Sequence, residues 1–342
     1  MKLLSRSLLL SLVVAASVVA IGCSPPAPNT PDQKGGGGGD STAKDSAKPD
    51  DKNKPASWPR DGSKEKPLLV MLVPADGGTE DGTKKDFVPI FNAISKTKSL
   101  TFDIKVGQSY SAVIEAMANG QVDIAFFGAV SYLQCKKKGG AELLAVEVHK
   151  GSSIYYSGIF TRADTGIEKI EDLKGKSVAF GDPSSTSSFN YPAAMLLDAK
   201  IDPVKDLGKI VMAGSHVNSL MACAEGKVDA CCASFDSLEK AVTDKKIEAG
   251  KLKAIKKSDP IPAPPIAMNP GLPADLKQKL RDGFATVHKA EGVTPDMVRG
   301  YGGKKVDRYD TEYKESEFMK AAEKLEVVDK IKADILKKAG AQ

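Results

Sequence analysis

The chain has 342 residues and a formal net charge of +5, with 27% charged and 41% hydrophobic residues. Its charges are interspersed and lack a stacked aromatic pattern, so lysine runs such as 136–138 indicate solvated faces and no nucleic-acid partner. The three histidines have no metal-ligand spacing with the five cysteines, which argues against a metal site.

The N-terminus predicts export. A basic start is followed by an apolar run over 8–21, which has the length of a signal segment and is short for a membrane-spanning helix. The run ends in Ala20-Ile21-Gly22-Cys23, which resembles a bacterial lipobox with Ala20 in place of the usual leucine. We therefore expect a lipoprotein signal peptide over 1–22 and lipidation of Cys23; an ordinary cleaved signal is the alternative.

Residues 23–66 are rich in Pro, Gly, Ser, Asp and Lys and almost devoid of apolar side chains, Trp58 excepted. Such a composition cannot bury enough surface to offset chain entropy, so it predicts a flexible tether. The remaining 67–342 is long enough for a sizeable core and two lobes.

Strand-like and helix-like runs alternate along this part. Strands are expected at 68–73, 101–106, 122–127, 142–148, 155–161, 177–180, 209–213 and 230–233, and helices at 85–95, 109–119, 131–137, 168–173, 191–200, 217–224 and 237–243, with a mainly helical region from about 270. This order predicts parallel sheets covered on both faces, with a ligand site at the carboxyl ends of the strands.

The turn at 181–188, Gly-Asp-Pro-Ser-Ser-Thr-Ser-Ser, is the strongest local signal for a binding site. It lies between an expected strand and an expected helix, where free backbone N–H groups and hydroxyl donors together favour an anion. Serine and threonine also cap ordinary helices, so the turn alone leaves both interpretations open.

Two similar phrases, Asn-Gly-Gln-Val-Asp-Ile-Ala at 119–125 and Glu-Gly-Lys-Val-Asp-Ala at 225–230, indicate two lobes of similar build. This arrangement resembles the type II periplasmic binding proteins. Within that superfamily the chain is similar to the phosphate, phosphite and phosphonate-binding proteins of ABC importers, through phrases that occur in family order at 110–117, 123–128, 155–157, 171–176, 182–187 and 214–216.

The resemblance implies an α/β fold of two lobes, each a mostly parallel sheet flanked by helices, with the ligand in the cleft between them. We expect lobe 1 at about 67–160 plus 255–342 and lobe 2 at about 161–254. The family resemblance also implies the ligand-binding residues, which are Tyr110, Phe127, Ser185, Thr186, Ser187, His216 and Asp236. For His216 the alternative is a helix-capping histidine on a surface loop, and for Asp236 a surface aspartate that caps the next helix.

One departure from the family bears on the ligand. Binders of aminoalkylphosphonates carry an acidic residue after an Ile-Pro, and here Pro264 stands at that position. A proline cannot pair with an ammonium group, so aminoethylphosphonate is disfavoured. Phosphate, phosphite and a small phosphonate remain, without a ranking among them.

The expected function is therefore capture of a small phosphorus oxyanion by lobe closure, for the permease and ATPase of an ABC importer. The protein would lie in the cell envelope, held to a membrane by its lipid, and would be neither an enzyme nor dependent on a cofactor. A partner of an oxyanion-sensing histidine kinase is one alternative. An anchored phosphoester hydrolase is another, disfavoured because no Gly-x-Ser-x-Gly elbow and no Asp–His metal spacing occur.

Overall fold

The computed structural model describes residues 58–77 and 80–340, and residues 54–342 form one compact unit. The expected signal peptide, Cys23 and most of the expected tether lie outside the described residues. Among the helices that are described, none combines the length and the apolar character needed to cross a bilayer.

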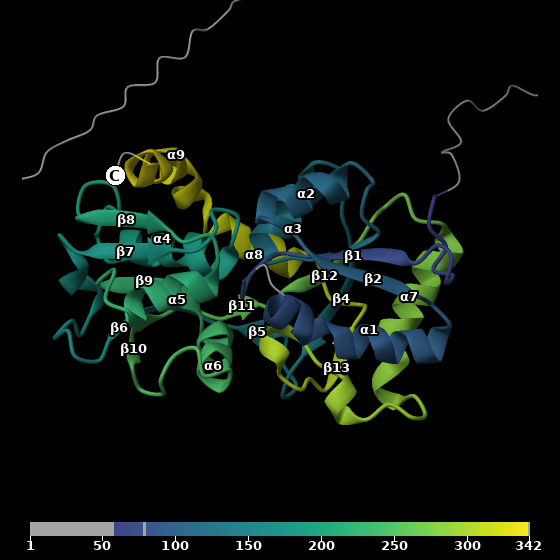
Figure 1. Ribbon diagram of the computed structural model, residues 1–342. Coiled ribbons are helices and arrows are strands. Elements are labelled where there is room, and N and C mark those ends of the chain that lie inside the picture. The colour runs from purple at the N-terminus through teal and green to yellow at the C-terminus, as the bar shows by residue number, and fades with distance from the viewer. Residues whose placement is uncertain (1–57, 78–79, 341–342) are drawn as a thin grey trace, which may run out of the picture. The chain divides into compact units, whose positions relative to one another are not determined.

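The first of two sheets contains six strands (Figure 1). Its strand order is β13 (Arg308–Asp310), β4 (Glu142–Val148), β12 (Pro265–Met268), β3 (Ile124–Phe126), β1 (Leu68–Leu72) and β2 (Phe102–Val106). Helices α2 (Tyr110–Ala118), α3 (Ala129–Lys137) and α8 (Ser316–Glu323) pack together on one side, and α1 (Lys85–Lys98) and α7 (Ala274–Thr286) pack together on the other.

The second sheet contains five strands. Its order is β10 (Leu252–Lys257), β6 (Ser157–Arg162), β9 (Ala230–Ser234), β7 (Ser177–Phe180) and β8 (Lys209–Met212). Helices α4 (Tyr191–Asp198) and α9 (Glu326–Gly340) cover one side, and α5 (His216–Ala224) and α6 (Phe235–Thr243) cover the other (Figure 1).

Both sheets are mixed, whereas we expected mostly parallel ones. In the first, β1 runs parallel to β2 and β3, but β12 runs antiparallel to β3 and β4. In the second, β7 runs parallel to β8 and β9, but β6 runs antiparallel to β9 and β10. The reason is the crossing between lobes: the chain leaves through β5 (Ile154–Tyr155) and returns through β11 (Ile261–Pro262), and these pair as an antiparallel ribbon.

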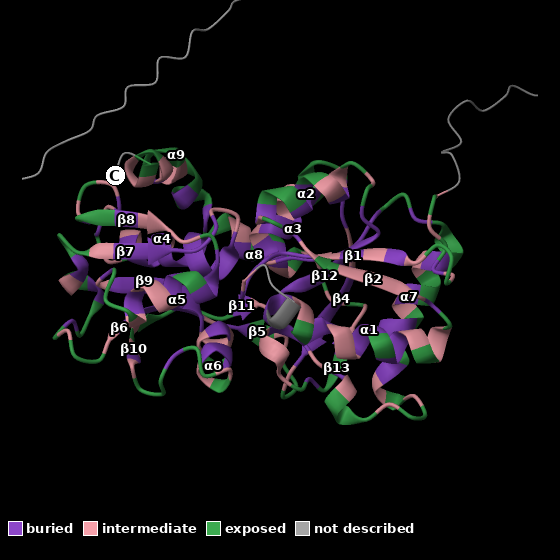
Figure 2. Cartoon of the chain, in the orientation of Figure 1, coloured by how far each residue is buried: buried purple, intermediate pink, exposed green. Residues whose placement is uncertain are grey.

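The two similar phrases perform the same structural task in the two sheets. The Asp123 carboxylate accepts the N–H of Leu69 at 2.6 Å, and the Asp229 carboxylate accepts the N–H of Ser177 at 2.8 Å. Each aspartate thereby ties its own strand to the start of the neighbouring parallel strand. The central strands β9 and β12 are buried throughout, whereas the edge strands β2, β8 and β10 include half-exposed and exposed residues (Figure 2).

Two boundaries differ from the expected ones. Residues 58–66, assigned to the tether, pack on the first lobe, where the Trp58 indole and the Arg60 guanidinium both donate to buried Asp123. Helix α9, assigned to lobe 1, packs on β8 of the second sheet instead. Its apolar face explains this, because Val328 and Ile335 are fully buried in the core of the second lobe.

Candidate ligand-binding site

Four helical segments begin around one small space between the two sheets. Helices α2 and α3 follow strands β2 and β3 of the first sheet, and the helical turn 186–190 and α5 follow β7 and β8 of the second. Serines cap three of them: the side chains of Ser109, Ser185 and Ser215 each accept a backbone N–H three residues ahead. The first N–H groups of a helix lack partners within it, so this space has a positive potential without a cationic side chain.

The cavity at this point measures about 10 Å³, on the order of the room that one buried water needs. Within the described part of the chain, no Asp, Glu, Lys or Arg side chain lines it. It is lined by Val73, Ala75, Tyr110, Phe126, Gly128, Tyr155, Ser185, Thr186, Ser187, His216, Pro264 and Tyr301.

The expected Ser185-Thr186-Ser187 loop forms one wall and is held from several sides. The Ser185 hydroxyl accepts the N–H of Ser188 at 3.2 Å, and the Ser187 carbonyl accepts the hydroxyl of Ser157 at 2.6 Å. The Thr186 hydroxyl accepts the N–H of Val130 at 2.9 Å, from the first turn of α3 in the other lobe. All three loop residues are at least 97% buried, so their hydroxyls lie in a dry environment.

His216 is a neutral hydrogen-bond donor toward the same wall. Its Nδ1 accepts the N–H of Ser234 at 3.0 Å, which leaves the proton on Nε2, and Nε2 lies 3.2 Å from the Ser185 hydroxyl. Burial lowers the pKa of His216 to about 3. The residue is 2% exposed and follows the Ser215 cap, so the alternative of a histidine on a surface loop is wrong.

Tyrosines form the opposite walls. Tyr110 opens α2, as expected, and desolvation raises its pKa well above the usual value, so it stays protonated. Tyr155 and Tyr301 also line the cavity, although neither was among the expected site residues. Tyr155 belongs to the family phrase at 155–157 and could have been found there. Tyr301 lies in the region that we expected to contain only packing helices, where Gly300-Tyr301-Gly302-Gly303 was the one available signal.

Phe127 does not line the cavity, contrary to expectation. It is fully buried in the first-lobe core, and its neighbour Phe126 lines the cavity instead. Successive strand residues point to opposite faces, so the pairing of β3 decides which phenylalanine reaches the site. The Phe126 ring lies 5.6 Å from the Tyr301 ring.

Asp236 also lies outside the cavity. It occupies the first turn of α6, and its carboxylate is 3.0 Å from the ammonium of Lys304. The helix cap is Ser234, whose hydroxyl accepts the N–H of Ser237 at 3.1 Å, so Asp236 is not the cap residue either. Pro264, by contrast, does line the cavity, at the place where the family resemblance puts the acid that would pair with an ammonium.

The two lobes are in direct contact around this space. Besides the Thr186–Val130 bond, the N–H of His216 donates to the carbonyl of Ala75 at 2.8 Å. Helix N-termini, hydroxyls and a neutral imidazole are the donors with which a protein replaces the water shell of an oxyanion. The cavity therefore carries donors of the kind that suit an oxyanion, and the two lobes meet around it.

Comparisons with known proteins agree with this geometry. At 31% identity over 244 residues, the chain matches the phosphate-import protein PhnD of Mycolicibacterium smegmatis, covering 68% of this chain and 75% of that protein. At 28% identity over 237 residues, it matches the phosphonates-binding periplasmic protein of Escherichia coli, covering 68% of each.

Solved structures share the fold. The binding component of an ABC phosphonate transporter from Pseudomonas aeruginosa has a TM-score of 0.64 at 21% identity, covering 80% of this chain and 98% of that one. PhnD1 of Prochlorococcus marinus, solved with methylphosphonate, has a TM-score of 0.65 at 16% identity, covering 77% and 98%.

A family model described as "ABC transporter, phosphonate, periplasmic substrate-binding protein" matches residues 78–309. Membership of this family accounts for both the two-lobe α/β fold and the order of the family phrases in the sequence. The chain belongs to this family of extracytoplasmic substrate-binding proteins of ABC transporters, whose members bind a transported substrate and are not enzymes.

Proposed function

We propose that this protein captures phosphate, phosphite or a small phosphonate in the cavity between its lobes and presents it to an ABC importer. The observation that carries the proposal is the convergence of four helical N-termini on a cavity walled by Ser185, Thr186, Ser187 and neutral His216. The fold already holds these donors in place, so they can replace the water around the ligand when the lobes close.

The proposed ligand-binding residues are Tyr110, Tyr155, Ser185, Thr186, Ser187, His216 and Tyr301. Phe127 and Asp236 are no longer among them. The presence of Pro264 in the cavity wall disfavours an aminoalkylphosphonate, whose ammonium would be left without an acidic partner. The curated relatives import phosphate in one case and bind phosphonates in the other, which supports the ligand class and leaves its members to be compared.

We further propose that Cys23 is lipidated and that residues 23–57 tether the domain near its permease. The lipobox-like sequence before Cys23 and the composition after it support this proposal. Metabolic labelling with a radioactive fatty acid tests it, with Cys23→Ser as the unlabelled control. A wild-type chain that takes up no label contradicts it.

The ligand is tested by calorimetric titration of the 54–342 unit, freed of bound molecules by unfolding and refolding. Phosphate, phosphite, methylphosphonate and aminoethylphosphonate are compared side by side. We expect micromolar or tighter binding of at least one of the first three, and clearly weaker binding in Thr186→Val, which removes a hydroxyl while keeping the volume. Absence of binding to all four would overturn the oxyanion site.

A further inference from the structure

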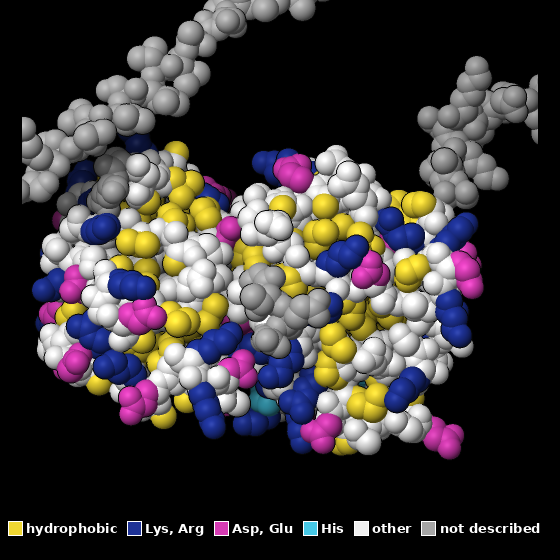
Figure 3. Space-filling model, viewed as in Figure 1, with side chains coloured by type: hydrophobic (Ala, Val, Ile, Leu, Met, Phe, Trp, Pro, Cys, Tyr) yellow, Lys and Arg dark blue, Asp and Glu magenta, His cyan; other side chains and the backbone are white. Residues whose placement is uncertain are grey.

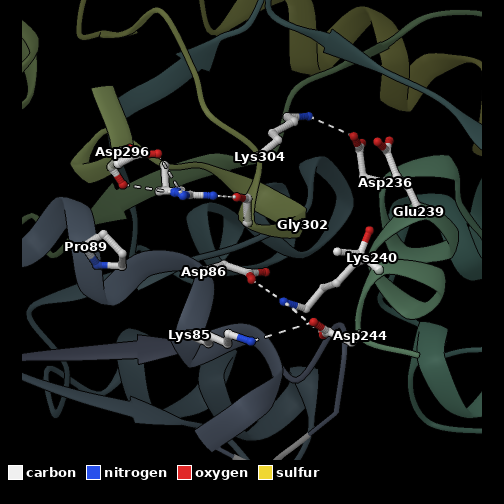
Figure 4. A pocket seen from close by; sticks show the side chains of 13 residues that line it. Lys85, Asp86, Pro89, Asp236, Glu239, Lys240, Asp244, Asp296, Gly302 and Lys304 are labelled. Carbon is white, nitrogen blue, oxygen red and sulfur yellow. Dashed lines mark hydrogen bonds and ion pairs between the residues drawn. The ribbon is translucent and has the colours of Figure 1, made fainter. Parts of the chain in front are cut away.

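A second zone of contact between the lobes surrounds helix α6, beside the ligand cavity (Figure 4). Lys240 of α6 is paired with Asp86 of α1, and Asp236 of α6 lies 3.0 Å from Lys304. Helix α1 and the segment that holds Lys304 belong to the first lobe, and α6 belongs to the second. We call the four residues Asp86, Asp236, Lys240 and Lys304 the α6 clamp.

The two pairs have opposite polarity. The first lobe contributes one acid and one base, and α6 contributes one base and one acid, so the two pairs form together only when the lobes close in a single register. Within their own lobes, Lys240 also lies 3.8 Å from Asp244 and Lys304 lies 2.9 Å from Glu147. Charges arranged in this way select one docking geometry, because a shifted arrangement brings like charges together.

The clamp lines a separate space of about 450 Å³ and no part of the oxyanion cavity. The remaining cations that line this space are also paired, Lys85 with Asp244 at 3.7 Å and Arg299 with Asp296 at 3.2 Å. Figure 4 shows Lys85 directed toward Asp244, Lys240 toward Asp86 and Lys304 toward Asp236. These three pairs join the two lobes, whereas the pair of Arg299 and Asp296 lies within the first lobe. Within the described part of the chain, every cation that lines the space thus has an acidic partner.

Burial makes the Asp86–Lys240 pair sensitive to loss of either partner. The side chains are 1% and 7% exposed, and each meets the opposite lobe. Gly302 and Gly303 of the first lobe also lie against the Asp86 carboxylate. A buried pair gains little over an apolar contact, but a buried charge without its partner is strongly unfavourable. Removing one partner therefore penalises the closed arrangement and leaves the open lobes, where the other partner is solvated, nearly unaffected.

We propose that the α6 clamp sets the affinity of this protein for its ligand without touching the ligand, and that Lys240 and Asp236 act as positioning residues for closure. The inference rests on the proposed function for its ligand, but the clamp itself can be measured without one. Opening of the lobes must break these pairs. The clamp therefore acts on the rate of ligand release more than on the rate of ligand association.

The test uses Lys240→Met and Asp236→Asn in the 54–342 unit. Lys305→Met is the matched control, because Lys305 is 59% exposed and pairs with Asp296 of its own lobe. We expect Lys240→Met to weaken binding of the best oxyanion about 30-fold or more through faster release, and Asp236→Asn to weaken it less because the pair is more exposed. The control should bind like the wild type.

A double variant separates positioning from simple loss of structure. Adding Asp86→Asn to Lys240→Met removes the unpaired charge, so the affinity should recover toward that of the wild type. Wild-type affinity in both Lys240→Met and Asp236→Asn, or a further loss in the double variant, would overturn the clamp. Asp236→Asn serves as the folded variant if Lys240→Met should fail to fold, because Lys304 keeps Glu147 as a partner at 2.9 Å.

If the wild type binds none of the phosphorus oxyanions, the proposed function fails and the clamp is tested by small-angle X-ray scattering of the ligand-free proteins. We expect a larger radius of gyration in Lys240→Met than in the wild type, restored by Asp86→Asn. Identical scattering of the three proteins would refute the clamp independently of any ligand.

Discussion

Substitution of Gly128 by alanine should oppose lobe closure while leaving each lobe folded. Gly128 precedes α3 in the first lobe and has φ −84°, which alanine adopts without strain. A Cβ at this position would lie 2.9 Å from the hydroxyl oxygen of Thr186 in the second lobe. The conflict therefore exists only when the lobes are together.

The size of the effect follows from these distances. Ordinary contact begins at 3.4 Å, so the hydroxyl must retreat by about 0.5 Å, and its 2.9 Å bond from the N–H of Val130 then becomes too long. Overpacking of this kind costs about 1–3 kcal/mol, which corresponds to a loss of affinity of roughly 5- to 150-fold. The ligand-free unfolding temperature should fall by no more than about 4 °C, since alanine is a poorer helix cap than glycine.

Calorimetric titration of the best oxyanion, with thermal unfolding of the ligand-free protein, measures both quantities. The decisive control is Thr186→Ala, which removes the opposing oxygen and leaves the new Cβ without the close contact. In that background, Gly128→Ala should cause little further loss. A loss of the same size in both backgrounds would mean that the methyl group meets the ligand itself, and would refute closure as the cause.

Two further predictions concern the interior. Desolvation raises the pKa of Asp76 to about 6; Asp236 adds to the rise, and Ser237, Lys240 and Lys246 oppose it more weakly. Its Oδ2 has no hydrogen-bond partner among the described residues. Because the folded-state pKa exceeds the unfolded one, this carboxyl contributes stability that is complete below about pH 4 and is lost as the pH rises through 6. The unfolding temperature should fall over that interval, and Asp76→Asn should flatten the change; an unaltered slope would contradict the assignment. Asp123 is fully buried and accepts from Trp58, Arg60 and Leu69, so Asp123→Asn should cost about 3–5 kcal/mol in urea unfolding followed by Trp58 fluorescence. The half-buried Asp229 performs the same task in the second sheet, so equal losses in Asp123→Asn and Asp229→Asn would contradict the role of burial.

The surface agrees with the interpretation of the charge pattern. In Figure 3, acidic and basic side chains are interspersed over the visible face, with no single-sign field across it. The apolar periodicity and the glycine turns likewise predicted most strands and helices near their observed places. They missed β10, β11, β12 and β13, which follow the last expected strand; β10 and β13 are edge strands, and β11 has only two residues.

What the sequence by itself determined is local. The hydroxyl-rich turn at 181–188, between an expected strand and an expected helix, marked a wall that favours an anion. The family resemblance then singled out Ser185-Thr186-Ser187 and His216. The repeated aspartates could be identified as a shared feature, though not as ties between strands.

Tertiary structure alone decided which side chains meet across the cleft. The register of β3 turned Phe126 toward the cavity and Phe127 into the core, and Lys304 drew Asp236 into an ion pair beside the site. Tyr301 reaches the cavity from a segment far along the chain, where its hydroxyl lies 2.6 Å from that of Ser237. Such contacts depend on how two lobes pack, and no pattern within a few residues of each position encodes that packing.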